Sequence, residues 1–201
     1  MIIITSPHSI ANEAETINNL FEEGLPLLHL RKPEIYTSKL RRLIESVDSE
    51  YHSKLVLHHN YEIAADYNIN RLHFTEMNRE GFDGILKELK TGAEYIISAS
   101  VHTMPDFNQL SSRFDYAFFS PVYNSISKPG HNPKNDLGEI LKKRIAFDTK
   151  LVALGGITAN NCASLLTKGF DDFALLGGFW QAEKPMEEFR KCLKISNDHV
   201  R

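Results

Sequence analysis

Histidines are placed unevenly along this sequence. Only His52 and His199 fall outside the ends of short apolar runs and the residues just beyond them. An unperturbed imidazole titrates near pH 6.5, so a histidine can both accept and donate a proton at neutral pH. The pattern predicts a polar, titratable site for acid–base chemistry, although a structural role within a strand remains the alternative for each one. The seven histidines at these positions are His8, His29, His58, His59, His73, His102 and His131.

Two glycine pairs form a second chemical signal, Gly155-Gly156 in "ALGGIT" and Gly177-Gly178 in "LLGGFW". Backbone amides approach a phosphate closely where no Cβ is present, and a following helix adds amides and the positive end of its dipole. A single pair is usually a turn, but two pairs after the last two apolar runs predict a phosphate site.

The loop "SPVYNSISKPGHNP", residues 120–133, carries groups that bind anions. The hydroxyls of Ser125 and Ser127 and the ammonium of Lys128 can donate to anionic oxygens. Its prolines limit the freedom of the unbound loop. A rigid surface loop is the alternative, but Arg31 and Lys128 would then be cations with no anion to bind.

The elements that must position these residues alternate along the chain. Stretches with helical spacing of apolar residues separate most of the β-rich runs, which is typical of parallel βαβ units. Eight strands predict a (β/α)8 TIM barrel in one small domain, residues 1–201. A doubly wound sheet would have a glycine-rich turn after the first strand, where this chain reads "TSPHS". The predicted strands are residues 2–5, 27–31, 54–59, 71–74, 95–101, 116–122, 151–157 and 173–179.

In such a barrel the site lies at the carboxyl ends of the strands, with phosphate at the loops after strands seven and eight. Side chains alternate along a strand, so His29 and Arg31 share a face and are expected together at one opening. Ser98, Ser100 and His102 likewise share a face. His58 and His59 point in opposite directions and are not expected to chelate one metal ion together.

Composition excludes several classes of function. A net charge of -3 with both signs interspersed does not favour binding to nucleic acid or to a membrane surface. No apolar run approaches the roughly 18 residues of a membrane span, and the N-terminus lacks the pattern of a signal peptide. Cys162 and Cys192 do not form a disulfide framework or a zinc motif. We expect a cytoplasmic protein.

The segments above resemble a known family. Residues 120–128 are similar to the Gly-Pro-hydrophobic-aromatic-Pro-Thr-x-Thr-Lys segment of the thiamin phosphate synthase and TenI superfamily. Residues 99–103, "ASVHT", are similar to its Val-Ser-x-His-Thr segment, and residues 155–157 to its Gly-Gly-Ile. The resemblance runs through almost the whole chain and implies a thiamin-biosynthesis barrel that binds thiazole phosphate. The substrate-binding residues it implies are Arg31, Ser100, Ser125, Ser127, Lys128, Gly155, Gly156, Gly177 and Gly178.

The chain departs from the synthases of this superfamily at their magnesium ligands. Their Asn-Asp-Arg motif reads His58-His59-Asn60 here, and their aspartate after the fourth strand aligns with Asn78. Magnesium prefers carboxylate oxygen to imidazole, so no metal is predicted unless the synthase reaction holds. The Gln-x-Arg-x-Lys motif of the synthases also changes, because its lysine position is Pro33.

Histidine in place of that glutamine, at His29, is similar to the TenI branch, whose activity is thiazole tautomerisation. This proton transfer needs an acid, a base and anion binding, but no metal. The catalytic histidine of that branch aligns with Pro121, so His29, His102 and His131 are the candidate proton shuttles. A metal-dependent synthase and a non-catalytic binder of thiazole or thiamin phosphates remain the alternatives. The expected partner is a phosphorylated thiazole, and assembly as a homo-oligomer is left open.

Overall fold

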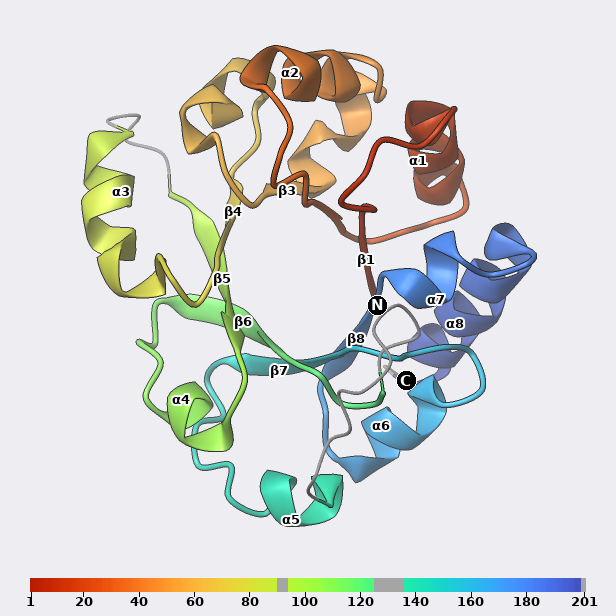
Figure 1. The fold of residues 1–201 in the computed structure, drawn as a ribbon. Coiled ribbons are helices and arrows are strands. Elements are labelled where there is room, and N and C mark those ends of the chain that lie inside the picture. The colour runs from red at the N-terminus through yellow and green to blue at the C-terminus, as the bar shows by residue number, and fades with distance from the viewer. Residues whose placement is uncertain (90–93, 125–135, 200–201) are drawn as a thin grey trace.

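The structure is a computed structural model that describes residues 1–89, 94–124 and 136–199. Eight parallel strands form a closed barrel in which each strand pairs with the next and β8 pairs with β1 (Figure 1). The predicted (β/α)8 barrel is therefore confirmed. The strands are β1 Ile2–Ile4, β2 Leu28–Leu30, β3 Leu55–Leu57, β4 Arg71–Phe74, β5 Ile96–Val101, β6 Phe114–Phe119, β7 Lys150–Leu154 and β8 Asp172–Leu175.

Helices surround the barrel (Figure 1). The segments that follow β2, β3 and β4 each include a 3₁₀ helix. The α-helices are α1 Glu13–Glu22, α2 Thr37–Glu45, α3 Phe82–Glu88, α4 Met104–Asn108, α5 Leu137–Leu141, α6 Cys162–Lys168, α7 Gly177–Trp180 and α8 Pro185–His199. The 3₁₀ helices are η1 Ser49–Lys54, η2 Tyr61–Tyr67 and η3 Arg79–Gly81. None of the described helices is long and apolar enough to cross a membrane.

Side-chain alternation along the strands divides the apolar residues into two layers. In β1, Ile3 joins the large cluster between the barrel and the helices. Its neighbours Ile2 and Ile4 belong to a smaller cluster with Tyr116 and Phe118 of β6. This smaller cluster, completed by residues of β7 and β8, fills one side of the barrel interior. The side made by β2 to β5 carries polar residues instead.

Six of the eight predicted strands end early, and the two that contain the glycine pairs are among them. The predicted strand 151–157 stops at Leu154, because Gly155 and Gly156 have φ values of 105° and 65°, which do not continue a strand. The predicted strand 173–179 stops at Leu175, and residues 177–179 form the start of α7. Both glycine pairs therefore lie in the loops at the carboxyl ends of the strands.

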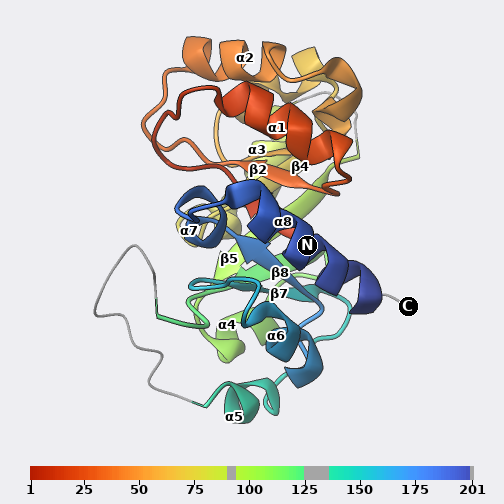
Figure 2. The same ribbon diagram turned by 90° about the vertical axis from the view of Figure 1, so that its right-hand side faces the viewer.

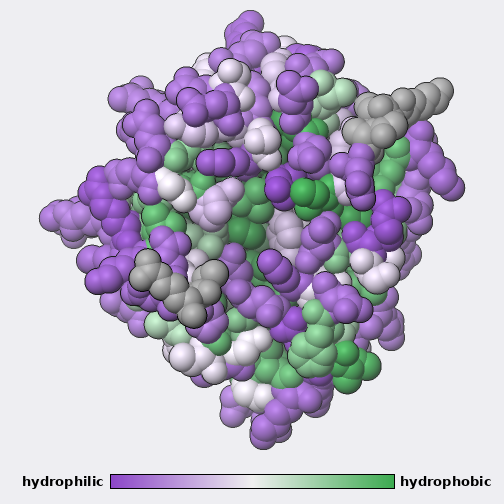
Figure 3. Space-filling model, turned by 180° about the vertical axis from the view of Figure 1, so that it is seen from behind, coloured by the Kyte–Doolittle hydropathy of each residue, from purple (hydrophilic) through white to green (hydrophobic). Residues whose placement is uncertain are grey.

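The two ends of the barrel differ in what they present. Figure 2 shows α7 at the end of the barrel toward which β8 runs. The loops after the strands gather at this end, and we call it the mouth. The face seen in Figure 3 is turned away from the viewer of Figure 1, and hydrophilic side chains surround apolar ones near its centre.

Candidate functional site

Arg31 lies at the mouth, but His29 does not. Arg31 is exposed just beyond β2, and its backbone N–H donates to Thr5 Oγ1 over 2.9 Å. His29 is fully buried, at 0% exposure. The expectation that both side chains meet at one opening was therefore wrong for His29. Its side chain has the predicted inward direction, but it ends inside the barrel.

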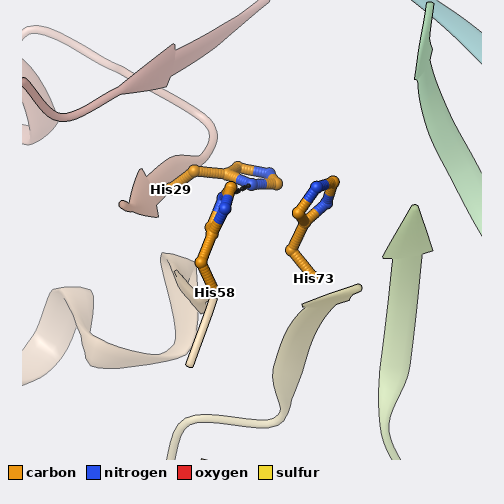
Figure 4. A group of neighbouring side chains, drawn as sticks. All are labelled: His29, His58 and His73. Atoms are coloured by element: carbon orange, nitrogen blue, oxygen red, sulfur yellow. Dashed lines mark hydrogen bonds between the residues drawn. The ribbon is translucent and has the colours of Figure 1, made fainter. Parts of the chain in front are cut away.

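Three histidines converge inside the barrel beneath the mouth (Figure 4). His29 comes from β2, His58 directly follows β3, and His73 comes from β4. His29 Nδ1 lies 2.9 Å from His58 Nε2, and its other ring nitrogen lies 2.7 Å from the hydroxyl of Tyr116. The rings of His58 and His73 pack at 4.2 Å between centroids. We call these three residues the histidine cluster.

Polar neighbours hold the histidine cluster in place. The ring nitrogens of His73 lie 2.9 Å from Ser98 Oγ and 2.8 Å from Ser100 Oγ. The hydroxyl oxygen of Tyr61 lies 2.6 Å from the carbonyl oxygen of His73 and 3.0 Å from that of His58, so its single hydrogen is shared between these two acceptors. Ser100, which the sequence placed in the substrate site, therefore contacts the histidine cluster.

Burial keeps the histidine cluster uncharged. It lowers the pKa of His29 and of His58 well below 6.5 and that of His73 to about 3, because a buried imidazolium loses its hydration. Neighbouring imidazoles and the guanidinium groups of Arg31 and Arg71 lower these pKa values further. The three imidazoles are neutral at pH 7.

His58 belongs to the histidine cluster and His59 does not, in agreement with their opposite directions. The missing information was the register across strands, in which Leu30 is level with Leu57 and Leu57 with Leu72. His29, His58 and His73 each lie one position from these leucines. A barrel register would have brought them together.

His102 is the candidate proton shuttle that the structure places at the mouth. It follows β5, and its Nδ1 lies 2.7 Å from the carbonyl oxygen of Ser120. Its Nε2 lies 3.6 Å from Glu76 Oε2, and both side chains are about half exposed. Because the carbonyl can only accept, Nδ1 carries the hydrogen, and neutral His102 keeps Nε2 free as a base.

The glycines bring three loops of the mouth together. A Cβ on Gly155 would lie 3.0 Å from Pro121, and one on Gly156 would contact Asn124 O and Tyr123 Cβ. A Cβ on Gly178 would contact the carbonyl oxygen of Ile157. The glycines thus allow the loops after β6, β7 and β8 to touch. Nearby, the indole Nε1 of Trp180 donates to Ile4 O over 2.8 Å and connects α7 to β1.

We expect Gly178→Ala to destabilise the protein by about 1–3 kcal/mol, because the new methyl group would overlap the Ile157 carbonyl. Gly84→Ala, inside α3, meets no atom within 4 Å and should be neutral or stabilising. Urea unfolding of both variants measures the difference. Equal stabilities would show that the loops after β7 and β8 separate without cost.

Four predicted site residues, Ser125, Ser127, Lys128 and His131, lie outside the described residues. The amides of Gly177 and Gly178 begin α7, where the first N–H groups of a helix have no intrahelical partner. Their role as phosphate donors stays a prediction.

The described part of the mouth does not fit a magnesium site made by protein carboxylates. Among the described residues, the histidine cluster, which lies beneath the mouth, is the only group of three or more His, Cys, Asp or Glu side chains close enough to share a metal ion. Glu76 faces His102, and the Asn78 amide donates to Tyr61 over 3.2 Å. Magnesium takes oxygen ligands, so these residues do not supply the set it needs.

Comparison with known proteins identifies a family and two similar solved structures. A family model described as thiamine monophosphate synthase matches residues 1–179. The thiamine-phosphate synthase of Streptococcus suis (strain 98HAH33) is 24% identical over 148 residues, which are 73% of this chain and 63% of that protein. The match thus spans less than two thirds of that relative's length.

Two solved structures share the fold. The thiamine phosphate pyrophosphorylase of Bacteroides thetaiotaomicron is 26% identical, with a TM-score of 0.78 and coverage of 98% of this chain and 97% of that one. The thiamine phosphate pyrophosphorylase of Pyrococcus furiosus is 18% identical, with a TM-score of 0.80 and coverage of 100% and 96%. The second likeness shows the fold alone.

Proposed function

Because the chain belongs to the thiamine monophosphate synthase family, we propose that it is an enzyme of thiamin biosynthesis that isomerises a phosphorylated thiazole by metal-independent proton transfer. The observation that carries this proposal is His102, held at the mouth between a backbone carbonyl and the carboxylate of Glu76. The arrangement supplies one base, a group that orients it and a charge that stabilises its protonated form. Such a set suits a proton transfer and does not itself require a metal.

The reaction needs two anion sites around the proton shuttle. The phosphate would bind at the amides that begin α7 and at the glycines after β7, because helix N-termini and glycine loops favour anions. The exposed guanidinium of Arg31 would face the carboxylate of the thiazole. His102 lies in the loop after β5, on the same end of the barrel. Binding both anions would fix the ring relative to the imidazole.

The proton would move in two steps. Nε2 of neutral His102 takes a proton from one atom of the thiazole, while Nδ1–H stays hydrogen-bonded to Ser120 O. Glu76, 3.6 Å away, stabilises the imidazolium that forms. The imidazolium then returns the proton to a different atom of the ring system, and the enzyme is restored. His29, which the sequence offered for this role, would act only through intervening groups.

Two alternatives stay open to test. The relatives are named for the synthase reaction, in which a pyrimidine diphosphate joins thiazole phosphate and diphosphate is released. The departures at His59 and Asn78 weigh against it. A non-catalytic binder of thiazole or thiamin phosphates is the second alternative.

A paired assay separates these reactions. The purified protein is given the thiazole carboxylate phosphate, with and without the pyrimidine diphosphate, each in magnesium and in chelator. Isomerised thiazole in chelator supports the proposal. Thiamin phosphate that forms only with magnesium would establish the synthase. Ligand-induced stabilisation without either product would indicate a binder.

We expect His102→Gln to lower kcat by about 10²- to 10⁴-fold with little change in KM, because general acid–base catalysis contributes that much. Glu76→Gln should lower kcat less, since it removes only the charge beside the imidazole. His199→Gln, an exposed substitution at the end of α8, is the matched control and should keep full activity. Full activity of the His102 variant would exclude this shuttle.

A further inference from the structure

The histidine cluster has the donor set of a metal site. Each side chain can direct one ring nitrogen at a common point, and these atoms lie within 4.8 Å of one another (Figure 4). A tetrahedral zinc ion with Zn–N distances of about 2.0–2.1 Å holds its nitrogen ligands roughly 3.3–3.4 Å apart. His29 Nδ1 and His58 Nε2, at 2.9 Å, need only a small separation to reach that spacing.

The imidazoles are in the state that a metal requires. A histidine ligates through a neutral ring, and protons compete with the metal for the lone pair. The pKa of each of the three is lowered by burial, so protons compete little at neutral pH. Hydroxyls and aromatic rings are among the described groups that contact the three imidazoles.

The surrounding hydroxyls can orient the histidine ligands through hydrogen bonds to the ring nitrogens that do not bind the metal. When a histidine binds a metal through one nitrogen, its other N–H usually donates to a fixed oxygen, which sets the ring orientation. If His29 binds through Nδ1, its Nε2–H donates to the Tyr116 hydroxyl at 2.7 Å. His73 can bind through one nitrogen and keep the serine at the other. Ser98 Oγ also lies 3.4 Å from Leu72 O, which offers its hydroxyl another acceptor.

The backbone also brings the ligands together. The Tyr61 hydroxyl bonds to the carbonyl oxygens of both His58 and His73, so the ends of β3 and β4 are held at a fixed separation. His58 is 7% exposed, more than His29 and His73, which are fully buried.

We propose that His29, His58 and His73 bind one divalent transition-metal ion of the zinc type. An all-imidazole set suits zinc, copper, nickel or iron and does not suit magnesium or calcium. Three protein ligands leave a fourth position for water, as in open zinc sites. The proposal is independent of the proposed isomerase reaction, because it concerns metal affinity and needs no turnover.

The test uses the full chain, stripped with EDTA and titrated with zinc chloride in competition with a chromophoric chelator. We expect one zinc ion per chain and a rise in melting temperature. Cobalt(II) at the same site should give the intense visible absorption of a tetrahedral ion. His58→Gln should weaken zinc binding at least 100-fold. His102→Gln, which changes a histidine outside the histidine cluster, should bind zinc like the parent.

One further variant and one spectrum make the outcome decisive. Cys162→Ser with Cys192→Ser removes both thiols of the chain and should leave zinc binding unchanged. If His58→Gln fails to fold, the cobalt spectrum of the parent protein decides, because thiolate and imidazole ligands give different charge-transfer bands. Absence of stoichiometric binding by the parent, or equal affinity in a folded His58→Gln variant, would overturn the proposal.

Discussion

As the pH is lowered from 8 to 5, the free energy of unfolding of the metal-free protein should fall. It should fall by up to about 4 kcal/mol per pH unit below about pH 6.5. The unfolded chain binds protons at its histidines near that value, whereas folded His29, His58 and His73 stay neutral because burial lowers their pKa. The unfolded state therefore binds up to three more protons. Each proton corresponds to about 1.36 kcal/mol per pH unit, and the loss continues for His73 toward its pKa of about 3.

Urea unfolding in chelator at several pH values measures this slope. The range from pH 8 to pH 5 is chosen because most carboxylates stay ionised there. His58→Gln should reduce the slope by about one proton, while His199→Gln, at an exposed position, should leave it unchanged. A flat profile from pH 7 to pH 5 would contradict the idea that the imidazoles are buried and uncharged.

Replacing Lys32 by Met should destabilise the protein by about 3–5 kcal/mol, because it leaves the carboxylate of Glu13 buried without its partner. The Lys32 ammonium lies 2.7 Å from both carboxylate oxygens and donates to His8 O over 2.8 Å. The side chains are only 2% and 6% exposed. Burial raises the pKa of Glu13 even with Lys32 beside it, so the carboxyl will tend to protonate in the variant.

The double variant Glu13→Leu with Lys32→Met removes both charges, so it shows how much of the loss comes from leaving one buried charge unpaired. It should recover most of the lost stability, since apolar replacements of a buried ion pair are often neutral. Lys142→Met breaks an exposed pair with Glu139 at 2.6 Å and should cost less than about 1 kcal/mol. If Lys32→Met cost no more than Lys142→Met, water would have to reach Glu13 in the folded protein.

Much of the fold was predictable because the barrel repeats one local pattern. Apolar runs such as "RLHF", residues 71–74, coincide with the observed β4. The errors lie at strand ends, where "LGGF" continues an apolar run although Gly177 and Gly178 start a helix. Apolarity alone does not distinguish a buried strand from a buried helical turn.

The site was predictable in part. The glycine pairs and His102 lie in the loops where the barrel rule places them. The histidine cluster was not found, because strand register decides which positions on separate strands meet. The pairing of Lys32 with Glu13 was also missed, since a lysine next to Arg31 gives no sign that it is buried.

Trp180 lies in α7 at the mouth, where its fluorescence can report on ligand binding. It is the only tryptophan of the chain, its ring lies 4.8 Å from that of Phe179, and Gly177 begins the same helical turn. A phosphate held at the start of α7 would change the polarity around this indole. Intrinsic fluorescence of the unlabelled protein therefore offers a direct readout of ligand occupancy and of its rate of exchange.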